Sequence, residues 1–196
     1  MKTIAFVFTF LFLSLCAFSA PFGLKMGMTA EEVENVCDMR KVQFEDDDWF
    51  YFFPVKKHSL FETYIARIDK KFGLYYVRAI GYEIETDGYG TSLKNALDEI
   101  KDKLAKSYGE PKFTDELDPN YSDWSSYDSD FEWFSSVIDG HRVYEYVWDN
   151  QANLPKDILK IDMFIHVESS PRRGRIVLDY ELANHKDIQE EEDTFF

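Results

Sequence analysis

Cysteine and basic residues are scarce in this chain. Its 196 residues include two cysteines, and 37 aspartates and glutamates outnumber 22 lysines and arginines, which gives a formal net charge of −15. Small secreted folds that depend on disulfides carry many more cysteines, and nucleic-acid binding needs clustered cations to neutralise phosphates. The first shortage excludes a disulfide scaffold. The second argues against nucleic acid and against anionic membrane surfaces as partners.

A hydrophobic run long enough to span a membrane is also missing. The main apolar stretch is Ile4–Cys16, whereas a membrane-spanning helix takes about 20 residues. Lys2 precedes this stretch and small residues follow it, which is the order of a secretory signal peptide. We predict that residues 1–19 are a signal peptide and that cleavage leaves Ala20 first. The protein is then exported to the periplasm or the extracellular space, with no membrane span after cleavage.

The sequence predicts a different chemical state for each of the two cysteines. Lipid attachment at Cys16 is the alternative to cleavage after residue 19, although Leu15 stands where lipidation usually has a small residue. After cleavage Cys37 is alone, so no disulfide can form within the chain. We expect a buried and unreactive thiol at Cys37.

Hydrophobic periodicity beyond the signal segment predicts one α+β domain over residues 20–185, followed by a frayed acidic tail over 186–196. Helices are expected from a cap at Thr29 to about residue 38 and over residues 92–107, and each strand pattern alternates, as in an antiparallel sheet with one wet face. We predict two helices packed on one face of a mainly antiparallel sheet, and the order of the elements leaves open whether a helix-plus-three-strand unit occurs twice. The expected strands are residues 49–55, 63–69, 74–86, 142–149, 158–168 and 175–183.

Residues 112–140 have the least regular pattern and are expected to form a long acidic loop with one short strand around residues 131–137. Loops of this length are usually functional or disordered, and the aromatic residues argue against disorder. Aromatic residues, 17% of the chain, gather in 49–53, 121–134 and 144–148. Core packing is the simpler explanation, and an aromatic groove for a peptide, glycan or protein is the alternative. The predicted binding residues in this loop are Trp124, Tyr127, Trp133 and Phe134.

No catalytic motif or cofactor-binding motif occurs in the sequence. The acidic loop offers oxygen ligands that calcium could use, but it lacks the residue order of an EF-hand, and solvated acids are the simpler interpretation. Asp179 and Glu181 share a strand face, which we expect to be solvated, and the arginine-rich turn over 171–175 is expected to be a solvated hairpin tip. The candidate metal ligands are Asp118, Asp123, Asp128 and Asp130.

Residues 24–33 read Leu-Lys-Met-Gly-Met-Thr-Ala-Glu-Glu-Val. Thr29 followed by Glu32 is the spacing of a capping box, in which each side chain binds the other residue's backbone N–H. This stretch resembles the start of the first helix in SmpA/BamE-like outer-membrane assembly lipoproteins, although the Leu-Gly-x-Pro that follows that helix in the family is absent here. The resemblance implies a binding or scaffold module of the cell envelope without catalytic residues.

These observations together predict a non-enzymatic binding or scaffold module of the cell envelope, whose partner is another envelope protein or a peptide. One alternative is a carboxylate-dependent hydrolase or a secreted calcium-binding protein that uses the acidic loop. Another is a purely structural envelope protein.

Overall fold

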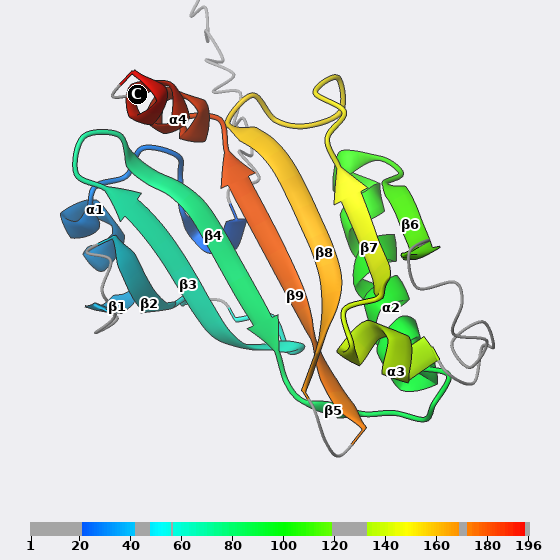
Figure 1. Ribbon diagram of the computed structural model, residues 1–196. Helices are drawn as coiled ribbons and strands as arrows, with labels where there is room; N and C mark the ends of the chain where they lie inside the picture. The colour runs from blue at the N-terminus through cyan, green and yellow to red at the C-terminus, as the bar shows by residue number, and fades with distance from the viewer. Residues whose placement is uncertain (1–20, 42–47, 56, 119–132, 169–171, 195–196) are drawn as a thin grey trace, which may run out of the picture.

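The computed structural model describes residues 21–41, 48–55, 57–118, 133–168 and 172–194 (Figure 1). In chain order the elements are a 3-10 turn η1 (Pro21–Gly23), α1 (Ala30–Glu34), β1 (Asp38–Lys41), β2 (Trp49–Phe53), β3 (Phe61–Asp69), β4 (Gly73–Gly81), β5 (Ile84–Glu85), α2 (Thr91–Tyr108), β6 (Lys112–Leu117), α3 (Trp133–Ile138), β7 (Arg142–Trp148), β8 (Ile158–Glu168), β9 (Arg173–Leu182) and α4 (His185–Asp193).

The strands form one antiparallel sheet, which confirms the predicted α+β class. Their spatial order is β1-β2-β3-β4-β9-β8-β7-β6, and the short β5 also pairs with β9. Each half of the sheet is a four-strand meander preceded by a helix, α1 for β1–β4 and α2 for β6–β9, and the last strands of the two meanders pair with each other. The two halves therefore share a helix followed by four strands, and α3 interrupts the second half between β6 and β7.

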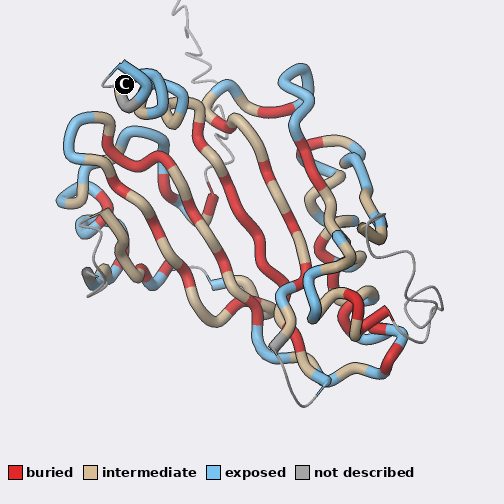
Figure 2. The backbone as a smooth tube through the Cα atoms, in the orientation of Figure 1, coloured by how far each residue is buried: buried red, intermediate tan, exposed pale blue. Residues whose placement is uncertain are grey.

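The core lies on one side of this sheet, between the strands and the helices. Register pairs Val77 with Tyr180 and Ala79 with Leu178, so these side chains share a face, and α2 buries Leu93 and Leu97 in the same cluster. Residues 21–28 complete the core on the β1–β4 half, where Leu24 is buried. Figure 2 shows buried residues running along β9 and its neighbours β4 and β8.

Local signals explain where the two predicted helices begin. At α1 the Thr29 hydroxyl accepts a hydrogen bond from the Glu32 N–H at 3.3 Å, and the Glu32 carboxylate accepts one from the Thr29 N–H at 2.8 Å, so the capping box is confirmed. At α2 the N-cap is Gly90, whose φ of +73° lies in the left-handed region. A Cβ at Gly90 would stand 2.0 Å from the Trp133 ring, so only glycine fits this position.

The predicted loop over residues 112–140 was wrong in its described parts. Residues 112–117 form the edge strand β6, which has few apolar residues to reveal it. Residues 133–138 form helix α3 rather than a strand, because its apolar side chains recur four residues apart. The Asp38–Lys41 strand β1 was also missed.

The frayed acidic tail was also a wrong prediction, because residues 185–193 form helix α4. This helix has little apolar surface, and polar contacts hold it to the sheet. His185 Nδ1 lies 2.7 Å from Glu181 Oε1, its ring lies 5.1 Å from the Tyr75 ring, and Lys71 forms an ion pair with Glu191.

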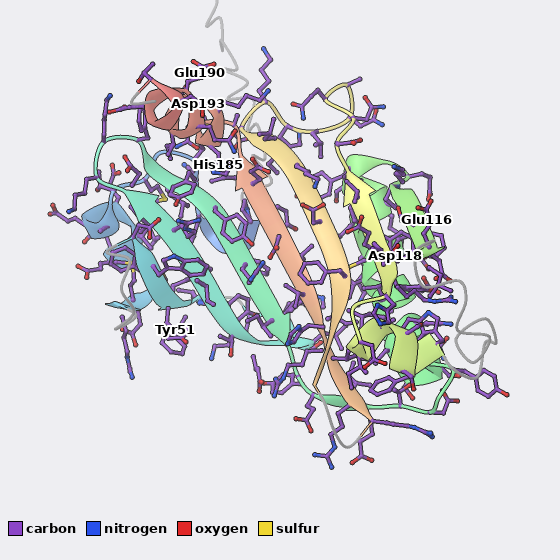
Figure 3. The ribbon with its side chains drawn as sticks, viewed as in Figure 1. Tyr51, Glu116, Asp118, His185, Glu190 and Asp193 are labelled. Atoms are coloured by element: carbon purple, nitrogen blue, oxygen red, sulfur yellow. The ribbon has the colours of Figure 1, made fainter. Side chains whose placement is uncertain are left out.

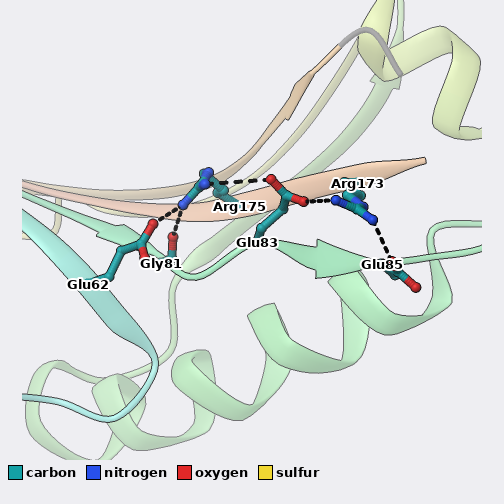
Figure 4. A network of polar contacts seen from close by, with 6 residues as sticks. All are labelled: Glu62, Gly81, Glu83, Glu85, Arg173 and Arg175. Atoms are coloured by element: carbon teal, nitrogen blue, oxygen red, sulfur yellow. Dashed lines mark hydrogen bonds and ion pairs between the residues drawn. The ribbon is translucent and has the colours of Figure 1, made fainter. Parts of the chain in front are cut away.

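Arg173 and Arg175 lie within strand β9 rather than in a turn. The prediction of a solvated hairpin tip was therefore wrong for these two arginines. Arg173 donates to Glu83 at 2.6 Å and to Glu85 at 2.8 Å. Arg175 pairs with Glu62 and donates to the Gly81 carbonyl at 3.0 Å (Figure 4). These contacts join β9 to β3, to the end of β4 and to the segment that follows β4.

Candidate functional site

The structure describes two of the four aromatic residues that were predicted to bind a partner. Trp133 is fully buried and Phe134 is 5% exposed, so both rings belong to the core between α3 and the sheet. Trp124 and Tyr127 lie outside the described residues. The two described residues therefore offer no ring surface to a partner.

The candidate metal ligands fall mostly outside the described part of the chain. Asp123, Asp128 and Asp130 are not described, and the backbone N–H of Asp118 donates to the His141 carbonyl at 2.7 Å. Within the described residues no group of three or more His, Cys, Asp or Glu side chains is placed to hold a metal ion. A calcium site in the acidic loop stays a prediction.

The side of the sheet opposite α1, α2 and α3 is the candidate functional surface, and we call it the open face. In Figure 1 strand β7 lies in front of α2, and no described helix crosses in front of β4, β9 or β8. Strand alternation sends every second side chain to this face. The cross-strand register identifies Trp49, Tyr51, Ile65, Arg67, Tyr76 and Arg78 from β2–β4, and Glu145, Lys160, Asp162, Phe164, Asp179 and Glu181 from β7–β9.

The centre of the open face is an ion pair across the junction between the two meanders. Arg78 on β4 and Asp179 on β9 are register partners, and the Arg78 Nε and Nη2 atoms each donate to an Asp179 oxygen at 2.7 Å. The Asp179 side chain is only 9% exposed. Asp179 is therefore a buried carboxylate with a bidentate partner, not the solvated residue that strand alternation predicted.

A second carboxylate lies opposite Asp179 on the next strand. Asp162 on β8 is its register partner and forms an ion pair with Lys160 at 2.8 Å. Burial raises the pKa of Asp162, and the nearby carboxylates of Asp179 and Glu181 raise it further, while Lys160 opposes the shift. The Tyr76 hydroxyl beside this group has its pKa raised by burial and then by Asp179.

The raised pKa of Asp162 predicts a pH dependence of stability. The folded protein holds this proton more tightly than the unfolded chain, so Asp162 stabilises the fold in acid and the contribution is lost as pH rises above the ordinary aspartate value of 3.8 and through the raised pKa. We therefore expect the difference in melting temperature, Asp162→Asn minus the parent chain, to increase as the pH rises across that window. A pH series of thermal melts at constant ionic strength measures this, and a difference that does not change with pH would contradict it.

Aromatic residues and arginine occupy the β2–β3 part of the open face. The Arg67 guanidinium lies 4.9 Å from the centre of the Trp49 ring and 5.1 Å from that of Tyr75, and it forms an ion pair with Asp48 at 2.9 Å. These contacts hold the arginine between two rings. Tyr51 lies beside them on β2, on the flank of the sheet opposite Glu116 (Figure 3).

The open face is much less acidic than the chain as a whole. Its carboxylates alternate with cations, whereas the whole chain carries a net charge of −15. By register, the acidic side chains include Asp38, Glu116, Glu145, Asp162, Asp179 and Glu181, and the basic ones include Arg40, Arg67, Arg78, Lys112, Lys160, Arg173 and Arg175.

Small-molecule chemistry has little support in the described residues. A pocket of about 150 Å³ lies at the end of β7, next to Tyr108, Glu110, Trp148 and Asp149, and ligand pockets usually have volumes of about 300–1,000 Å³. Cys37 is buried, as predicted, its Sγ–H donates to the Val33 carbonyl at 3.3 Å, and burial raises its pKa. A protonated thiol of this kind is a poor nucleophile.

Comparisons of this chain with protein-family models, with curated proteins and with solved structures found no match. Within its described part, the chain also has no helix with the length and apolar character needed to cross a membrane.

Proposed function

We propose that this protein is an exported, non-enzymatic binding module of the cell envelope that holds another protein against its open face. The observation that carries the proposal is the set of partly exposed aromatic and arginine side chains on the side of the sheet opposite α1, α2 and α3, where α4 contacts only one end, at Glu181. Trp, Tyr and Arg are the residue types that dominate the energetics of protein interfaces.

The size of the open face fits a protein partner. Eight strands spaced about 4.8 Å apart, with roughly seven residues each, give a surface of about 35 by 23 Å, or about 800 Å². A standard interface buries about 800 Å² on each partner. A small molecule would cover only a fraction of this area.

The charge arrangement supports the same function. Charged residues in the middle of the open face occur as Arg78–Asp179 and Lys160–Asp162 pairs, so a partner that covers them meets little uncompensated charge. The predicted signal peptide over residues 1–19, and the resemblance of residues 24–33 to SmpA/BamE-like lipoproteins, support an envelope location.

A photo-crosslinking experiment tests this function. Benzoylphenylalanine placed at Tyr51 on the open face is expected to capture one discrete protein in cells of the native host, because its ring lies at the interface. The matched control is the same residue at Lys103, which is 49% exposed on α2 on the opposite side. Equal adducts at both positions, or none at Tyr51, would contradict the proposal.

A further inference from the structure

Two carboxylates on the open face, Glu116 and Glu145, form no direct ion pair with any described residue, although the charge of Glu145 reaches Lys160 and helps to raise the pKa of that lysine. Asp162, Asp179 and Glu181 contact Lys160, Arg78 and His185, whereas Glu145 on β7 forms no ion pair with any described residue. Its register partner is Phe164 on β8, so the Glu145 carboxylate lies beside an aromatic ring on the same face. The two side chains are half-buried.

Apolar side chains surround this pair of residues. Val143 and Val147 lie two residues to either side of Glu145 on β7 and therefore share its face. Val143 is 50% exposed and Val147 is buried. A long aliphatic side chain from outside could pack along Val143 and the Phe164 ring and end at Glu145.

We propose, on the basis of the proposed function, that Glu145 and Phe164 form a subsite for a lysine or arginine side chain of the partner protein. Both residue types pack their methylene stems on apolar surface and keep the cation at its edge. A cation over an aromatic ring and a carboxylate within reach are two favourable contacts for such a group. Charge complementarity favours a basic partner over a second copy of this chain, which carries −15.

Charge reversal at Glu145 tests the subsite through the Tyr51 crosslink. Glu145→Lys is expected to reduce the yield of the adduct about tenfold, and the near-isosteric Glu145→Gln to reduce it about threefold, because the partner's cation loses its counter-charge. The control is Glu99→Lys, which makes the same charge change at a side chain that is 60% exposed on α2. We expect the control to keep the parent yield.

The outcomes separate this inference from the proposed function. An unchanged yield with Glu145→Lys, or an equal loss with Glu99→Lys, would overturn the subsite while leaving the open face as the binding surface. Failure of the unaltered chain to form the Tyr51 adduct would overturn the proposed function itself. Thermal melts of the variants show whether a lost adduct reflects unfolding. If Glu145→Lys unfolds, the adduct yield of Glu145→Gln, which keeps the side-chain shape, tests the subsite in its place.

A second measurement needs no partner. Arginine ethyl ester is the probe in an NMR titration, and citrulline ethyl ester, which has the same shape without the side-chain charge, is its control. We expect arginine ester to shift the amide signals of Val143, Glu145 and Phe164 most, and Glu145→Gln to remove these shifts. Equal shifts with citrulline ester, or shifts that persist in Glu145→Gln, would overturn the subsite.

Discussion

Replacing Trp133 by alanine is expected to lower the free energy of unfolding by about 3–5 kcal/mol. The Trp133 ring is fully buried, meets the Tyr144 ring edge-on at 5.1 Å and fills the space that Gly90 leaves open. Alanine would leave a cavity bounded by α2, α3 and β7. Urea unfolding followed by circular dichroism measures the change.

The matched control for Trp133 is Tyr89→Ala, because Tyr89 is an aromatic residue that is 46% exposed. Surface substitutions usually change stability by less than about 0.5 kcal/mol. A loss below about 1 kcal/mol for Trp133→Ala would show that the ring is not part of the core. Since the variant unfolds easily, any loss of binding in it would not locate the interface, which is why Tyr51 is the position used for crosslinking.

Replacing Asp179 by alanine is expected to cost about 3 kcal/mol, because it leaves the Arg78 guanidinium without its bidentate partner at the centre of the sheet. This value is at the lower end for buried pairs, since the Arg78 side chain is 31% exposed and water can partly solvate it. Equilibrium unfolding in urea at pH 7 measures the loss.

A double-mutant cycle separates the ion pair from packing. Arg78→Met combined with Asp179→Leu replaces both charges with apolar groups of similar size, and such replacements are often nearly neutral. We expect the double variant to recover most of the stability that the single Asp179→Leu variant loses. A double variant as unstable as the sum of the single variants would show that the two side chains act independently.

The parts of the fold that could be predicted from the sequence are those in which apolar residues recur with a regular spacing. Helix α2 has apolar residues on one face and is confirmed, and β8 and β9 alternate as expected. The missed elements have weak hydrophobic periodicity. Strand β6 is an edge strand with charged residues on both faces, and α4 is acidic along most of its length. Their positions depend on pairing with β7 and on contacts from Lys71 and Tyr75, which no local pattern contains.

The open face was only partly predictable. Alternation correctly put Asp179 and Glu181 on one face, and the aromatic cluster at residues 49–53 marked one flank. Alternation does not tell which strands are neighbours. Arg78 and Asp179 are far apart in the chain, and only the β4–β9 pairing brings them together. The expectation of a wet strand face failed at Asp179 for this reason.

The place of β9 in the sheet has a consequence for how the chain matures. β9 is the last strand in sequence, yet it lies at the middle of the sheet and pairs with both β4 and β8. A polypeptide that emerges from its N-terminus first must wait for residues 173–182 before the two meanders can join, and until then β4 presents an unpaired strand edge. Such long-range pairing slows folding and exposes the incomplete chain to aggregation. Loss of residues 173–196, about an eighth of the sequence, would therefore disrupt the whole sheet rather than only its edge.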